Sequence, residues 1–148
     1  MALFDAIYEF SDAQSIVINS GSSSVSTDVV DLGSDMKDAF RSAVTTQKLA
    51  GYGGPPLTVV ITINTTMVGG KITAALKSKA SSASISSGAT SHGTVVLTAS
   101  STAGTKFTIP VPTEDFARYV GLLYTAASGN VTAGAVDAYL AMGDQIID

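Results

Sequence analysis

Along most of the chain, apolar residues alternate with polar ones, which is the pattern of a β-strand with one buried face. The segments 57–64 and 71–79 show the alternation most clearly, and the residues between their apolar positions are most often Thr or Lys. The segment 67–70 (Met-Val-Gly-Gly) lies between them and is typical of a turn. We therefore expect the two segments to form a hairpin or a close antiparallel pair.

Other short segments rich in β-branched and aromatic residues are also predicted to be strands. Because residues 117–125 are apolar on both faces, we expect them to form a central strand, and residues 128–130 (Ser-Gly-Asn) should turn the chain into the last strand. About eight strands separated by turns predict an all-β fold, a jelly-roll-like antiparallel β-sandwich. The remaining predicted strands span residues 14–19, 25–32, 94–99, 106–111 and 131–140.

Two stretches depart from the strand pattern. In residues 35–50 the apolar residues follow the spacing of one helix face, with Ser34 as a candidate N-cap and Gly51 after the end, so we predict one short helix there. Residues 80–93 are mostly Ser, Ala, Gly and Thr, and their only large apolar residue is Ile85. We predict a long loop for this tract.

The two ends of the sequence are predicted to lie outside the sandwich, which we place at residues 14–140. Residues 1–13 form an N-terminal arm in this interpretation, and residues 141–148 form a C-terminal tail that carries Ile146 and Ile147. Large apolar side chains need to be buried, either on the protein's own core or on a neighbouring subunit. The arm has five of them: Leu3, Phe4, Ile7, Tyr8 and Phe10.

Composition narrows the classes of partner. The chain has 148 residues, of which 45% are hydrophobic, so one domain with its own core is expected. Only 14% are charged, the net charge is −4, and Arg occurs only at positions 41 and 118, so the clustered cations of a nucleic-acid binder are missing. Ser and Thr are abundant, and a neutral, hydroxyl-rich surface packs against other proteins at little desolvation cost.

The sequence also carries no sign of secretion or membrane insertion. Its start contains Asp5 and Glu9 and no basic segment, so it does not match a signal peptide. No apolar run approaches the ~20 residues of a membrane-spanning helix. We expect a protein made in a cytoplasm, with neither a membrane nor a nucleic acid as partner.

Candidate chemistry is sparse. There is no Cys, and the single histidine, His92, falls short of the several ligands that a metal site needs. Glu114 and Asp115 are adjacent, and neighbouring side chains on an extended backbone diverge, which argues against a catalytic carboxylate pair. We therefore expect no enzymatic activity, no cofactor and no metal. Arg118 opens the predicted central strand, either paired with a carboxylate such as that of Asp31 or with its head in water.

Three parts of the sequence together resemble a known family. They are residues 10–14 (FSDAQ), residues 29–33 (VVDLG), and residues 118–124 (RYVGLLY) followed by 129–134 (GNVTAG). In this order they resemble the capsid cement, or decoration, proteins of short-tailed double-stranded DNA phages. The resemblance covers about a third of the chain, at its two ends, and the middle matches only in strand order.

The resemblance implies a non-enzymatic, jelly-roll-like protein on the outer surface of the virion capsid. Proteins of that family bind a shell of major capsid protein, often as dimers that staple neighbouring capsomers, so a homo-oligomer, with a dimer favoured, is expected. Asp31, Arg118 and Tyr119 fall in the matching segments and are expected to be structural. The candidate contacts with the capsid or a neighbouring subunit are the apolar residues of arm and tail: Phe4, Tyr8, Phe10, Ile146 and Ile147.

Two other functions stay open. A phage-borne carbohydrate- or receptor-binding β-sandwich would need aromatic side chains clustered in a cleft, and the chain has five Tyr and five Phe. A hydrolase with a hidden carboxylate pair would lose its activity on replacement of Glu114 or Asp115. Specific hits on a glycan array would favour the first of these alternatives.

Overall fold

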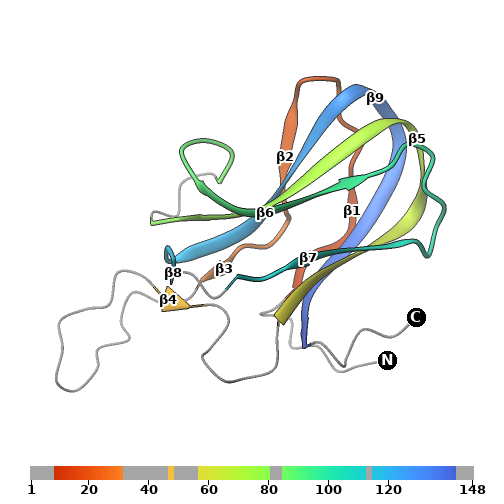
Figure 1. Cartoon of the computed structure of the whole chain (residues 1–148). Coiled ribbons are helices and arrows are strands. Elements are labelled where there is room, and N and C mark those ends of the chain that lie inside the picture. The colour runs from red at the N-terminus through yellow and green to blue at the C-terminus, as the bar shows by residue number, and fades with distance from the viewer. Residues whose placement is uncertain (1–8, 32–46, 49–56, 81–84, 113–114, 143–148) are drawn as a thin grey trace, which may run out of the picture.

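The computed structural model describes residues 9–31, 47–48, 57–80, 85–112 and 115–142, and every regular element in these ranges is a β-strand. Within them, no helix has the length and apolar character needed to cross a membrane. Figure 1 shows the strands: β1 (Glu9–Ser15), β2 (Ser23–Val25), β3 (Val30–Asp31), β4 (Gln47–Lys48), β5 (Leu57–Lys79), β6 (Thr90–Leu97), β7 (Lys106–Pro110), β8 (Asp115–Phe116) and β9 (Tyr119–Met142).

Two long strands, β5 and β9, organise the fold. β5 has 23 residues and β9 has 24, whereas an average strand has about five or six. They pair antiparallel along their whole length, from Leu57 opposite Met142 to Lys79 opposite Tyr119. Seven strands form one sheet in the order β1-β9-β5-β6, in which β2 and β3 also pair with β9, and β7 also pairs with β5; β4 and β8 form a separate pair.

The long strands are bent, so one sheet is folded into two facing layers (Figure 1). In the first layer, the first half of β5 pairs with β7, and the second half of β9 pairs with β1. In the second layer, the second half of β5 pairs with β6, and the first half of β9 pairs with β2 and β3. The all-β antiparallel prediction is confirmed, and the two layers are consistent with a jelly-roll-like sandwich.

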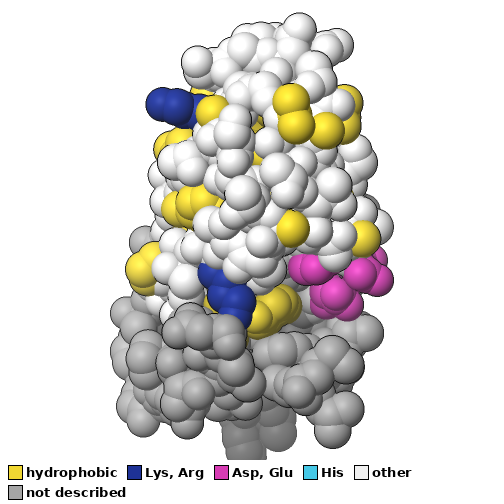
Figure 2. All heavy atoms as spheres, turned by 90° about the vertical axis from the view of Figure 1, so that its right-hand side faces the viewer, with side chains coloured by type: hydrophobic (Ala, Val, Ile, Leu, Met, Phe, Trp, Pro, Cys, Tyr) yellow, Lys and Arg dark blue, Asp and Glu magenta, His cyan; other side chains and the backbone are white. Residues whose placement is uncertain are grey.

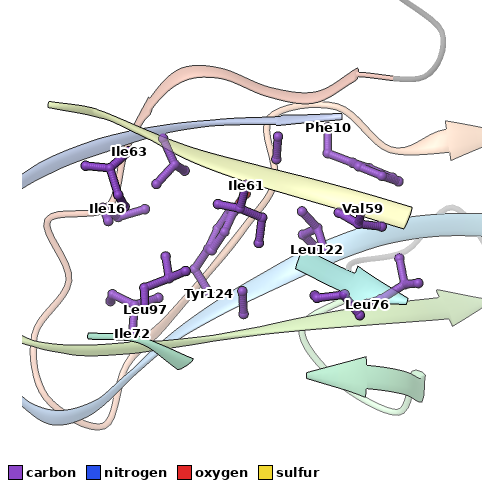
Figure 3. Packing of buried hydrophobic residues seen from close by; sticks show 14 of the residues in the cluster. Phe10, Ile16, Val59, Ile61, Ile63, Ile72, Leu76, Leu97, Leu122 and Tyr124 are labelled. Carbon is purple, nitrogen blue, oxygen red and sulfur yellow. The ribbon is translucent and has the colours of Figure 1, made fainter. Parts of the chain in front are cut away.

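The two layers enclose a hydrophobic core (Figure 3). Alternate residues of β5 point into it: Val59 and Ile61 from one layer, Ile72 and Leu76 from the other. Tyr124 of β9 reaches between the layers and is fully buried. Since full burial of an Ile or Leu side chain stabilises a fold by about 1.5–3 kcal/mol, the alternation along β5 and β9 holds the layers together.

One side of the sandwich is closed by polar side chains. Gln14 accepts hydrogen bonds from the Ser11 hydroxyl (2.6 Å) and the Thr27 amide (2.8 Å), and its own amide donates to the Val25 carbonyl (2.8 Å). The buried Tyr124 hydroxyl lies 2.9 Å from Ser11 Oγ. Burial raises the pKa of Tyr124, although the hydrogen bond with Ser11 acts in the opposite direction. These bonds join β1 of the first layer to the 25–27 segment beside the second.

The two predicted turns between long strands were wrong. Residues 67–70 lie inside β5 and residues 128–130 lie inside β9, and these segments face each other where the sheet bends. A hairpin turn and a sharp bend both need glycine, because both bring backbone close to backbone or require a positive φ. The glycines were therefore recognised as special positions, but the kind of distortion was misassigned.

The predicted N-terminal arm ends earlier than expected. Residues 9–13, placed in the arm, belong to β1 and pair with β9. Phe10 is fully buried in the core, so its side chain is not available at the surface and the prediction of a subunit contact for it needs correction. A Phe near the start of the sequence carries the same apolar signal whether it docks on its own core or on another molecule.

Other segments also differ in extent from the prediction. Residues 47–48, the end of the predicted helix, form β4, and the rest of that segment lies outside the described residues. The predicted strand over 25–32 is split between β2 and β3, and between them the Ser26 hydroxyl donates to the Asp28 carbonyl (2.8 Å). Of the predicted loop 80–93, residues 90–93 belong to β6, and Ile85 is buried.

Candidate functional site

The end of the molecule at which the sheet bends is built from four segments: residues 15–22, 63–70, 98–105 and 127–135. We call this surface the bend end. None of the four segments contains Asp, Glu, Lys, Arg or His, and none contains an aromatic residue. The charged residues among those that the structure describes therefore belong to other segments. In Figure 2 the upper part of the surface accordingly shows backbone and uncharged polar side chains (white) and hydrophobic side chains (yellow). Basic side chains (dark blue) lie at its margin, and acidic side chains (magenta) lie below it.

Backbone contacts join the four segments into one surface. Gly21 N–H donates to the Ala126 carbonyl (2.9 Å), and Val131 N–H donates to the Ile18 carbonyl (3.0 Å). Met67 N–H donates to the Ser101 carbonyl (2.9 Å). Side chains add to these bonds, because Ser20 N–H donates to Asn130 Oδ1 (2.8 Å). The bend end is thus a continuous, hydrogen-bonded layer of backbone.

The bend itself depends on a very close approach of β5 to β9. A Cβ added at Gly69 would lie 2.2 Å from the Asn130 carbonyl oxygen, and one added at Gly70 would lie 2.1 Å from that of Ser128. Gly69 also has a φ of 108°, which an L side chain rarely adopts. The pairing register shifts repeatedly between residues 63 and 72 of β5, as expected for a series of β-bulges.

Two large apolar side chains are exposed on this surface. Val17 is 57% exposed and Val68 is 51% exposed. Val17 lies between Ile16 and Ile18, whose backbones bond to Gly134 and Val131, and Val68 pairs with Ala133, so both valines border the same stretch of β9. The bend end therefore presents two methyl-bearing side chains among hydroxyl groups and backbone.

Acidic side chains gather beside the bend end rather than on it (Figure 2). Asp137 accepts hydrogen bonds from Ala13 N–H (2.6 Å) and from the Asn64 amide (3.0 Å). The pKa of Glu9 is raised by partial burial and by the nearby carboxylates of Asp12, Asp137 and Asp28, in that order. We call Glu9, Asp12, Asp28 and Asp137 the acidic group. No three metal-ligating side chains gather into a metal site among the residues that the structure describes.

His92 forms a short contact with a serine. Its Nε2 lies 2.6 Å from the Ser78 hydroxyl, which also accepts a hydrogen bond from Ala117 N–H (3.1 Å). His92 occupies a β-bulge, because Leu76 is opposite Gly93 while Lys77 is opposite Ser91. Ser78 is only 2% exposed, so a substrate has no access to its oxygen, and the bonds tie β5, β6 and the residues just before β9 together.

The structure places the other predicted residues as follows. Asp31 of β3 is paired with Tyr119 of β9, and the Arg118 guanidinium carbon lies 4.8 Å from the centre of the Tyr119 ring. The three residues expected to be structural are thus neighbours along one β3–β9 pairing, and Arg118 makes a cation–π contact. Asp115 lies in β8, opposite Lys48. The predicted contacts Phe4, Tyr8, Ile146 and Ile147, and Glu114, lie outside the described residues.

The prediction from sequence did not find the bend end. Its signal was present, since each of its segments is uncharged over eight residues or more. These segments were interpreted one by one as a loop, two turns and a strand, and only the pairing of β5 with β9 brings them together.

The fold and this surface define a class: an all-β protein with one uncharged end, in which the core lies between two layers that share the strands β5 and β9. A family model named Bbp16 matches residues 10–140, which is most of the chain, and the chain belongs to that family. This membership indicates a phage protein. A comparison with curated proteins found no match.

Proposed function

We propose that this chain is a structural virion protein that binds the outer surface of a phage capsid and staples neighbouring major capsid protein subunits. The observation that carries the proposal is the match of residues 10–140 to a phage family. The order of the segments 10–14, 29–33 and 118–134, which resembles capsid cement proteins, supports the narrower role. The proposed protein acts by adhesion and has no enzymatic activity, cofactor or metal.

The proposed role agrees with the physics of the fold. A stapling protein gains its affinity from several contacts, because the second contact forms at a high effective concentration once the first is made. It therefore needs a rigid body rather than a reactive site. Two layers joined through β5 and β9 supply such a body, and Ser78, the serine that contacts His92, is buried.

The proposal includes a homo-oligomer, most simply a dimer, and a location on the outside of the capsid. The apolar residues at the two ends of the sequence, Phe4, Tyr8, Ile146 and Ile147, stay candidate contacts with the capsid or with a neighbouring copy. Phe10 is withdrawn from this set because its side chain is in the core.

Co-sedimentation tests the proposal. Purified protein is mixed with assembled heads that lack it, the heads are pelleted, and bound protein is quantified against a saturation curve. We expect saturable binding, and we expect heads without the protein to release their DNA at a lower temperature than decorated heads. Heads that neither bind the protein nor differ in stability would contradict the proposal. An unrelated β-sandwich of similar charge controls for trapping in the pellet.

A further inference from the structure

We propose that the bend end is a face through which this protein contacts the capsid, and that it docks on an uncharged part of the capsid-subunit surface. This inference rests on the proposed function, and it adds a contact face within the described residues to the candidate contacts at the two ends of the sequence. It uses the bend end as defined above, residues 15–22, 63–70, 98–105 and 127–135.

The distribution of charge is the first argument. The central part of a protein–protein interface is depleted of Lys, Glu and Asp, because burying a charge without a partner is costly. The bend end is depleted completely, although the charged residues of the chain include Lys71 and Lys106 immediately beside it. A free surface gains solubility from interspersed charges, so an uncharged end is a cost unless it is covered.

The rigidity of the backbone is the second argument. Ala103 N–H donates to the Thr66 hydroxyl (3.1 Å) and Gly104 N–H donates to the Ile63 carbonyl (2.8 Å), which fixes the 98–105 loop against β5. The Thr132 hydroxyl lies 3.3 Å from the Val68 carbonyl, within reach of a hydrogen bond. A surface already held in one conformation loses little entropy on binding, so modest contacts give measurable affinity.

The position of the surface is the third argument. Asp31, Leu57 and Met142 border residues outside the described ranges, and the pairs Leu57–Met142 and Lys79–Tyr119 mark the end of the sheet away from the bend. The bend end is opposite to them (Figure 1). One end of the described fold can therefore lie on the shell while the strand ends at the other end stay away from it.

The chemistry of the bend end favours a neutral protein surface over other occupants. It has no Lys or Arg for nucleic acid or anionic lipid, and no aromatic ring for stacking on a sugar. An obligate dimer face is as apolar as a domain core, whereas the exposed large side chains here are Val17 and Val68. Hydroxyls, backbone groups and two valines suit a non-obligate contact with another protein.

The experiment compares charged substitutions at the two ends. Val68→Lys, Val68→Glu and Val17→Lys place a charge on the bend end, and both positions are at least half exposed, so we expect the fold to be retained. Val29→Lys and Val29→Glu are the matched controls, since Val29 is 38% exposed and packs near Gly121, away from the bend. The readouts are the dissociation constant for heads and the thermal midpoint of each variant.

We expect the three bend-end variants to bind heads about tenfold more weakly or worse. The Lys and Glu variants at Val68 should lose similar affinity, because the loss comes from desolvating a charge and not from its sign. The Val29 variants should bind like the original protein, and no variant should change its thermal midpoint appreciably.

Several outcomes would overturn the inference. Undiminished binding by the Val68 and Val17 variants would exclude this face, while binding of the original protein would still support the proposed function. A loss with only one sign of charge would show a charged partner surface. Weakened binding to a glycan, with head binding intact, would assign the bend end to a sugar. If the original protein does not bind heads, the proposed function itself fails.

Discussion

The bend end and the acidic group both include residues of β9, yet their surfaces differ in charge and in rigidity. At the bend end, backbones of β5 and β9 approach so closely that Gly69 and Gly70 leave no room for a side chain, and every residue is uncharged. At the acidic group, four carboxylates share one region, and their mutual repulsion contributes to the raised pKa of Glu9. One region is rigid and neutral, and the other is polar and electrostatically unfavourable.

The difference indicates which part of the surface is suited to remain exposed to solvent. Carboxylates that repel each other are tolerable only where solvent screens them, so the acidic group belongs to a hydrated side of the protein. An uncharged, hydrogen-bonded layer loses little when water is removed. The contrast therefore separates a solvent-facing region from one suited to contact, and the following predictions test it in order of effect.

The largest effect is expected from Phe10→Ala in β1. Phe10 is fully buried, so its loss should lower the free energy of unfolding by about 3–5 kcal/mol, measured by denaturant titration. If Phe10 is a core residue and not a contact, the remaining folded protein should bind heads with unchanged affinity. Weaker binding by fully folded Phe10→Ala protein would return Phe10 to the contact surface.

The second-largest effect is expected from substitution of a glycine at the bend, compared with a glycine outside β5 and β9 that also has a positive φ. Gly69→Ala and Gly21→Ala both place a side chain at positive φ, but only at Gly69 would the new Cβ meet another backbone. Gly69→Ala should therefore be less stable than Gly21→Ala by about 2–3 kcal/mol in chemical denaturation. Equal stabilities would mean that the strands can separate at the bend without cost.

The third effect concerns the closed side of the sandwich. Gln14→Ala removes three hydrogen bonds that join β1 to the 25–27 segment and to Ser11. Because the site is partly solvated, we expect a loss of about 1–2 kcal/mol, seen as a lower denaturation midpoint. Gln14→Glu is the matched variant: it keeps the acceptor but loses the donor to Val25, and a smaller loss than for Ala would identify the acceptor bonds as the important ones.

The smallest effect concerns pH. The folded-state pKa of Glu9 is raised above its usual value of 4.5, so the folded protein binds this proton more tightly than the unfolded chain does. The contribution of Glu9 to stability therefore increases as pH falls through its folded-state pKa and is lost again as pH rises. Glu9→Gln should raise the thermal midpoint slightly at neutral pH and not at acidic pH. A lower midpoint at neutral pH would show that the carboxylate is stabilising.

Much of the fold could be predicted from alternation alone, because a half-buried strand imposes a period of two on its side chains. The segments 57–64 and 71–79 were expected to bury their alternating apolar side chains on one face, and Val59, Ile61, Ile72 and Leu76 do lie in the core. The alternating pattern does not show whether two strand-like segments belong to one strand. Two strands joined by a turn and one strand with a bend have the same pattern. This is why β5 and β9 were each divided in two.

The candidate surface was harder to predict because it exists only after pairing. Val17, Val68 and Ala133 are far apart in the sequence, and each is unremarkable by itself. Phe10 shows a different difficulty. The sequence marks it as apolar, but it does not tell whether the side chain is buried in the protein's own core or against another subunit. The Asp31–Tyr119 pairing brings together residues that were singled out only as parts of a resemblance.

The late position of β9 in the chain has a consequence for synthesis. β9 pairs with β1, β2, β3 and β5, and all four precede it. A ribosome therefore releases each of these strands before the one that joins them, and the complete sheet assembles only after β9 has been made. A copy that stops before β9 can still pair β5 with β6 and β7, but it lacks the strand that joins β1, β2 and β3 to them.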